Sequence, residues 1–109
     1  MDPTKKVLPV EAEVREERAQ ALKLTTAALE EAVQFWKEAD AAITAKFDDA
    51  RRRAIAERDA RRREVERLLW NLVVQREALG LNHHEGVWVA LGLPADLRPD
   101  PHLKASANG

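Results

Sequence analysis

Two adjacent histidines and a glutamate, His83, His84 and Glu85, are the side chains of this 109-residue sequence best suited to binding a metal ion. If they lie on a helix, the two imidazoles point about 100° apart, so one ion cannot easily bind both. A complete site would need His102 or a second chain, because the sequence contains no cysteine. We therefore interpret the histidines as exposed loop residues that can titrate near neutral pH, and we predict no metal site.

The residue types needed for covalent or acid–base catalysis are not gathered in one part of the sequence. Serine occurs once, at Ser106, and the threonines and carboxylates are spread along the chain. Four glycines leave no room for a glycine-rich phosphate loop together with the turns around it. An enzyme also needs a concave site that excludes water, which a long helix hardly offers. We predict a non-enzymatic protein with no catalytic residues, no cofactor and no small-molecule substrate.

Arginine is the charged residue type that clusters most strongly. Residues 51–76 contain nine arginines and four acids, a local charge of +5. Two triplets account for six of them: Arg51, Arg52, Arg53, Arg61, Arg62 and Arg63. Acids placed four residues before an arginine, as Glu57 is before Arg61, favour a solvated, ion-paired helix face. The same six arginines are the candidate contacts to nucleic-acid phosphates or to an acidic partner.

The charge of the chain divides into two halves. The formal net charge is −1, but residues 1–50 sum to −4 (eleven acids, seven bases) and residues 51–109 sum to +3 (eight acids, eleven bases). This division is expected if the two halves lie against each other. The apolar runs are far shorter than the ~20 residues of a membrane-spanning helix. With no signal-like leader and no cysteine, we expect a cytoplasmic protein that does not bind membranes.

The stretch between Pro9 and Gly80 is free of both helix breakers, proline and glycine. Pro9 suits the first position of a helix, and the glutamates that follow it suit the positive end of the helix dipole. We predict a helix over residues 10–79, preceded by an arm over 1–9. A continuous helix of that length would be roughly 105 Å long, which a monomer of this size cannot bury. It must pair with itself, fold back or lie on a partner.

The spacing of apolar residues in the first half predicts the paired face of this helix. Alternate steps of three and four from Ala19 reach eleven positions up to Ala54, and nine of them are apolar. This heptad seam is typical of a coiled coil, although a helix in an ordinary bundle has the same period. We predict a homo-oligomer, a dimer in the first place, or a complex with a larger protein. The predicted interface consists of Leu22, Leu29, Val33, Trp36, Ile43 and Phe47.

Two interruptions of the seam leave the path of the chain open. Asp40 occupies a seam position, where a charged residue fixes register or marks the end of pairing. Beyond Ala54 the apolar positions shift by one residue. A continuous helix paired antiparallel with a second copy explains the charge halves, whereas a hairpin that reverses near residues 47–49 also explains the shift. We favour the continuous helix, because no glycine, proline or asparagine is available for a turn there.

A small helical module is expected over residues 80–93. Gly80 and Gly92 each stand between two leucines and predict left-handed helix caps. Asn82 and Glu85 predict a capping box at the start of a short helix between them. The residues expected to form an apolar cluster are Leu69, Leu72, Val73, Leu79, Leu81, Val87, Trp88, Leu91 and Leu93. Residues 94–109, with three prolines, are expected to form an extended tail.

The expected fold class is all-α: a long coiled-coil-like helix, or a helical hairpin, followed by a small helical cap and an extended tail. The leading hypothesis is an oligomerisation or adaptor protein that binds a protein partner. The alternative is a small dimeric DNA-binding protein, because residues 76–91 have the outline of a helix-turn-helix next to the arginine-rich helix. The fit is poor in detail, since the supposed recognition helix contains neither arginine nor lysine. A third hypothesis is a subunit that folds fully only on a larger partner.

Overall fold

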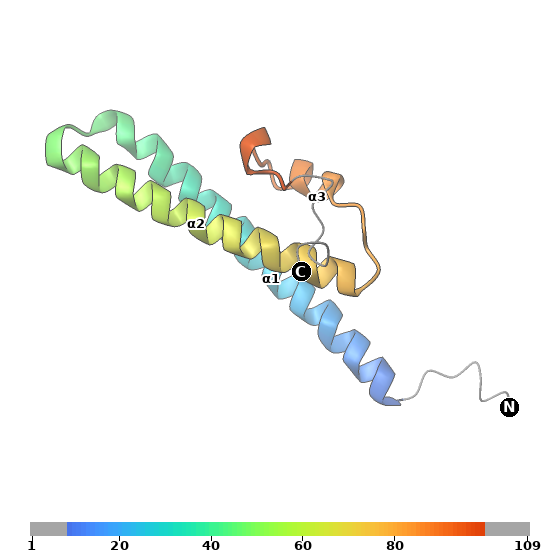
Figure 1. Cartoon of the computed structure of the whole chain (residues 1–109). Coiled ribbons are helices and arrows are strands. Elements are labelled where there is room, and N and C mark those ends of the chain that lie inside the picture. The colour runs from blue at the N-terminus through green and yellow to red at the C-terminus, as the bar shows by residue number, and fades with distance from the viewer. Residues whose placement is uncertain (1–8, 100–109) are drawn as a thin grey trace, which may run out of the picture.

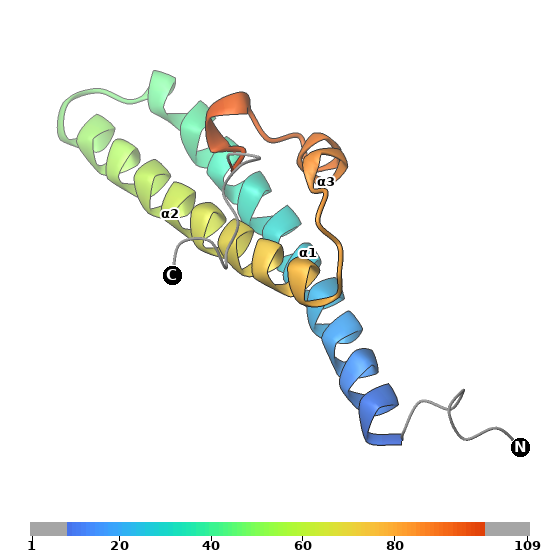
Figure 2. The same ribbon diagram turned by 45° about the vertical axis from the view of Figure 1, so that its right-hand side comes forward.

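The computed structural model describes residues 9–99, which form an antiparallel helical hairpin with a short C-terminal segment packed on its side (Figures 1 and 2). Helix α1 spans Pro9–Ala42 and helix α2 spans Asp48–Ala78, joined by the short 3-10 helix η2, Ile43–Ala45. The C-terminal segment contains α3, Glu85–Ala90, and the 3-10 helix η3, Ala95–Leu97. The all-α fold class is confirmed. Most of the predicted N-terminal arm and residues 100–109 of the tail lie outside the described residues.

The expectation of one continuous helix is wrong, because the chain reverses between Ala42 and Asp48. Ile43 and Thr44 are β-branched and favour helix less than the alanines before them. Phe47 is extended, and Asp48 takes a positive φ of 52°. Aspartate is among the few residues that adopt this left-handed conformation without glycine. The turn therefore needs none of the three residue types whose absence argued against it.

The core forms where three segments meet. Leu29 and Val33 of α1 and Val65 and Leu72 of α2 are all at most 4% exposed. Trp88 of α3 is also buried. The core cluster consists of Leu29, Ala32, Val33, Val65, Leu68, Leu69, Leu72, Val73, Trp88, Leu93 and Leu97. Helix α2 is apolar on most sides over residues 68–74. Both α1 and the C-terminal segment pack against this stretch and cover part of its apolar surface.

Both predicted glycine caps are confirmed. Gly80 and Gly92 have φ values of 81° and 67°. After α2, the amide of Leu81 donates to the carbonyl of Arg76 at 2.9 Å; after α3, the amide of Leu93 donates to that of Trp88 at 3.1 Å. These bonds define the Schellman motif. Leu93 then packs into the core, whereas Leu81 remains 42% exposed, contrary to the expected cluster.

Two details of the C-terminal segment differ from expectation. The predicted Asn82 cap is wrong, because α3 begins two residues later with His84 at the N-cap position and no side-chain cap. The start of the predicted extended tail is also wrong, since η3 turns Leu97 into the core at 5% exposure. Arg62 of α2 lies 3.1 Å from Asp96, and Arg98 donates to the carbonyl of Leu93 at 3.0 Å. The first contact joins η3 to α2, and the second stabilises the turn of the C-terminal segment itself.

The molecule is a rod of 72 × 26 × 25 Å. Its radius of gyration is 18.4 Å, well above the ~13 Å expected for a compact domain of this length. Both ribbon views show why: the first turns of α1 continue past the end of α2 (Figures 1 and 2). The hairpin turn and this free stretch of α1 therefore lie at opposite ends of the rod.

Candidate functional site

The predicted heptad seam faces inward, toward the rest of the same chain. Leu29, Val33 and Ile43 are buried. Leu22 and Trp36 pack against the core while partly exposed. Phe47 departs from the group, because it lies in the extended turn and is 75% exposed. Five of the six predicted interface residues are thus buried or partly buried within the chain, and Phe47 is exposed at the hairpin turn.

Asp40 meets a base within the hairpin. Arg58 of α2 donates from Nη1 to Asp40 Oδ1 at 3.4 Å and from Nε to its neighbour Asp59 at 3.0 Å. The hydrogen bond to Asp59 raises the pKa of the Arg58 guanidinium most, and the bond to Asp40 adds to it. The exposed carboxylate at this seam position is therefore paired with an arginine across the hairpin.

The six candidate arginines divide into paired and unpaired groups. Arg52 is paired with Asp49, Arg61 with Glu57 at 2.7 Å, and Arg62 with Asp96. Within the described residues, no acid lies within 4 Å of the charged groups of the other three. These unpaired arginines are Arg51, Arg53 and Arg63, and all three are exposed. Their positions leave them free to meet an anion or an acidic partner.

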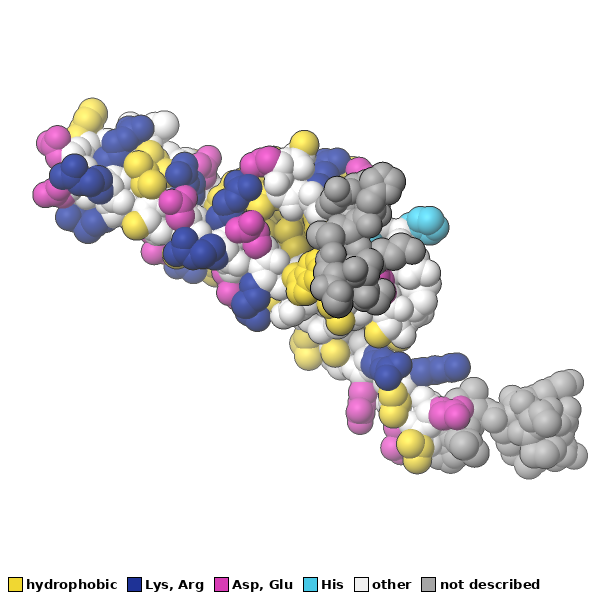
Figure 3. Space-filling model, in the orientation of Figure 1, with side chains coloured by type: hydrophobic (Ala, Val, Ile, Leu, Met, Phe, Trp, Pro, Cys, Tyr) yellow, Lys and Arg dark blue, Asp and Glu magenta, His cyan; other side chains and the backbone are white. Residues whose placement is uncertain are grey.

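The hairpin tip, residues 46–53, combines free charge with an exposed aromatic ring. It carries four bases and two acids, so its net charge is +2. The side chains of Lys46, Arg51, Arg52 and Arg53 are exposed, as is that of Phe47. Figure 3 shows basic and acidic side chains interspersed over this end of the rod. The tip is therefore a basic surface with one apolar contact at its apex.

The projecting end of α1, residues 10–20, was not singled out by the sequence. Every residue in it is exposed, and Val10 and Val14 are 69% and 37% exposed. Farther along the same helix, Leu24 is 62% exposed. Val10, Val14 and Leu24 share one side of α1 with two alanines. We call this side the outer stripe; it consists of Val10, Val14, Ala21, Leu24 and Ala28. Their spacing of three, four and seven residues could have revealed a second apolar face.

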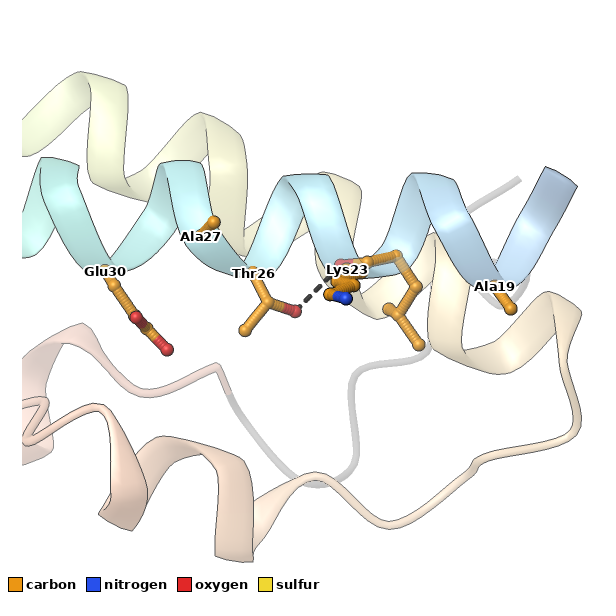
Figure 4. Close-up of a pocket in the computed structure, with 6 residues that line it drawn as sticks. Ala19, Lys23, Thr26, Ala27 and Glu30 are labelled. Atoms are coloured by element: carbon orange, nitrogen blue, oxygen red, sulfur yellow. Dashed lines mark hydrogen bonds between the residues drawn. The ribbon is translucent and has the colours of Figure 1, made fainter. Parts of the chain in front are cut away.

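A shallow groove of about 410 Å³ runs along the middle of α1. It is lined by Ala19, Leu22, Lys23, Thr26, Ala27 and Glu30. Figure 4 shows these side chains on α1, with the hydroxyl of Thr26 turned back onto its own helix. That hydroxyl donates to the carbonyl of Leu22 at 2.8 Å, so it is occupied. With all its lining residues on one helix, the groove offers no converging set of polar groups for a small molecule.

Of the two adjacent histidines predicted to be exposed, only one is exposed. His83 is exposed, but His84 packs at the junction of α2 and α3. Its Nδ1 accepts a hydrogen bond from Arg76 Nε at 2.9 Å, its Nε2 lies 3.7 Å from Glu77 Oε2, and its ring lies 5.8 Å from that of Trp88. Since Nδ1 accepts, the neutral ring carries its proton on Nε2. His84 is therefore a structural contact that holds the loop before α3.

We expect the stability of the fold to depend on pH through His84. Burial lowers the pKa of this imidazole first, and the charge of Arg76 lowers it further, against the opposing effect of Glu77. Because the unfolded chain then binds the proton more readily, stability is full above the unfolded pKa of about 6.5 and falls as the pH drops toward the lower folded pKa. Chemical denaturation from about pH 8 to about pH 5.5 should show this loss.

The control for this prediction is the pH dependence of two variants. His84→Gln should flatten the loss, while Asn82→Ala, an exposed loop change without a titrating group, should keep it. A His84→Gln variant with the full wild-type dependence would show that another group is responsible.

Comparisons with protein-family models, with curated proteins and with solved structures find no match. The structure itself shows the class: a small all-α protein built on an antiparallel helical hairpin. Among the described residues, no three metal-ligating side chains come together. No helix in that part of the chain is long and apolar enough to cross a membrane.

Proposed function

We propose that this chain is a non-enzymatic assembly protein, an oligomerisation or adaptor protein, that binds a protein partner through the projecting end of α1. One observation carries the proposal: residues 10–20 are helical, yet none of their side chains is buried within the chain. These turns extend the 34-residue helix α1 without the tertiary packing that supplies most helical stability in proteins. A partner that covers this end would supply the missing packing.

The outer stripe supplies the apolar part of this contact. Val10 and Leu24 are more than 60% exposed, and Val14 lies between them. An amphipathic helix laid on a groove or on another helix uses anchors at this spacing. The seam packs largely against the rest of the same chain. We therefore propose that a partner binds the outer stripe and not the seam residues that the sequence predicted as an interface.

The experiment is photocrosslinking from a photoreactive amino acid placed at Val14 in the full chain, expressed in its native cells. We expect a discrete protein adduct. The matched control places the same amino acid at Val89 of α3, which is 59% exposed but remote from the stripe. Absence of an adduct at position 14, or the same adducts from both positions, would contradict the proposal.

Nucleic-acid binding is the second candidate, and it is favoured by the unpaired Arg51 and Arg53 at the tip that carries the exposed Phe47, and by the unpaired Arg63 farther along α2. Arginines with an aromatic ring can contact phosphates and stack on a base. Helix α3 is poorly suited to recognising DNA bases. It has only six residues, contains no arginine or lysine, and buries Trp88 in the core. Arg52, Arg61 and Arg62 are also occupied by acids of the same chain. Assembly with a protein therefore stands first.

A further inference from the structure

We propose that the partner is a second copy of this chain, packed antiparallel, so that the projecting end of each copy lies on the hairpin tip of the other. The inference rests on the proposed function and adds to it the identity of the partner, the direction of packing and a second surface, the tip.

The projecting end is acidic and its charges are free. Residues 10–20 hold four glutamates and two arginines, so their net charge is −2. Three of the glutamates, Glu13, Glu16 and Glu17, line a hollow of about 340 Å³ together with Gln20. Of the ion pairs among the described residues, none involves this end. Within the described residues it thus presents a net negative charge around the exposed Val10 and Val14.

The hairpin tip has the complementary features. Its net charge of +2 is opposite to that of the projecting end, and Arg51 and Arg53 are exposed without an acid in reach among the described residues. Phe47 is the most exposed large apolar side chain of the described residues, at 75%. The tip and the projecting end therefore have opposite net charges. Each also exposes apolar side chains, Phe47 on the tip and two valines on the end, that can pack together.

The shape of the molecule decides how the two surfaces meet. They lie at opposite ends of a 72 Å rod, so one copy cannot bring its own together (Figure 1). Two copies packed antiparallel about a twofold axis form both contacts at once, and the pairing closes as a dimer. Parallel packing would instead place one basic tip against the other, which like charges oppose.

Charge exchange between the two surfaces tests this pairing. One variant reverses the end, Glu13→Arg with Glu17→Arg, and the other reverses the tip, Arg51→Glu with Arg53→Glu. In each variant alone, both surfaces have the same sign, so we expect the dissociation constant of the dimer to rise by about tenfold or more. Mixed together, the two variants form two matched contacts, and the dimer should return.

The readout is mass by light scattering across a dilution series, with helicity recorded to show that each variant is folded. The matched control reverses two exposed acids midway along the rod, Glu30→Arg with Glu66→Arg, and should leave the dimer intact, because Glu30 lies on the side of α1 opposite the outer stripe. Added salt should weaken the wild-type dimer, because the contact is between exposed charges.

Three results would overturn the inference: a wild-type chain that stays monomeric, single variants that dimerise as the wild type does, or a mixture that stays dissociated. Monomeric wild type with an adduct from position 14 to a different protein overturns the inference but leaves the proposed function standing. Monomeric wild type without that adduct overturns both. Monomeric wild type that binds duplex DNA only while the tip is basic would favour the nucleic-acid candidate.

Discussion

Replacing Leu29 with alanine should lower the free energy of unfolding by about 2–5 kcal/mol, the range for a fully buried leucine whose site cannot collapse. Leu29 is 0% exposed and belongs to the cluster that α1 shares with α2 and the C-terminal segment. Neighbouring side chains from three segments would have to move together to fill the cavity, so we expect a loss in the upper part of that range.

The matched control is a second leucine on the same helix. Leu24 is 62% exposed, so Leu24→Ala should change the free energy of unfolding by only about 0.5 kcal/mol. Urea denaturation followed by helicity measures both variants under identical conditions, at a protein concentration below dimer formation. Equal losses in the two variants would show that the seam is not covered within the chain.

The sequence predicted the inward face of α1 but not what covers it. Leu29, Val33 and Ile43 were singled out as seam residues, and all three are buried. A heptad period reports that one face of a helix needs apolar cover; it is the same whether that cover is α2 or a second copy. The heptad period therefore predicted which residues of α1 face the cover, but not whether the cover is α2 or a second copy.

The reversal could not be predicted from helix breakers, because the chain uses none. Asp48 adopts the left-handed conformation that glycine or asparagine would normally provide. Two weaker signals were present: the one-residue shift of apolar positions beyond Ala54, and the β-branched pair Ile43 and Thr44. The shift records that α2 presents a new face to α1 after the chain has turned.

The surfaces proposed to bind a partner were predictable only in part. The arginines of the tip stand out by composition, but which of them are free depends on contacts such as Arg62 with Asp96, 34 residues away in sequence. The exposure of Val10 and Val14 depends on where α2 ends relative to α1. Both features arise from the pairing of distant segments, which local propensity does not encode.

Replacing Trp88 with alanine should cost about 3–5 kcal/mol of unfolding free energy. The ring is 2% exposed, and it joins the six-residue helix α3 to the cluster that contains Leu69 and Leu72 of α2. A helix that short has no stability of its own, so α3 depends on this docking. Because the same cluster also includes Leu29 of α1, we expect the whole fold to lose stability, and not the C-terminal segment alone.

Two further variants test whether the stability loss of Trp88→Ala comes from the burial of its ring. Trp70→Ala removes the same side chain from an outer position of α2 that is 37% exposed, and should cost clearly less than Trp88→Ala because less apolar area is lost from the core. Trp88→Phe keeps an aromatic ring in the core and should restore part of the loss.

Hydrogen exchange in the Trp88→Ala variant separates global from local unfolding. If the fold is one cooperative unit, amides in the middle of α1 and α2 should lose protection in step with those of α3 and with the amide of Leu93, which donates to the Trp88 carbonyl. Loss of protection confined to residues 85–97, with an unchanged denaturation midpoint for the hairpin, would contradict this. The hairpin would then be the independent folding unit, and the C-terminal segment would be an addition that α2 can release.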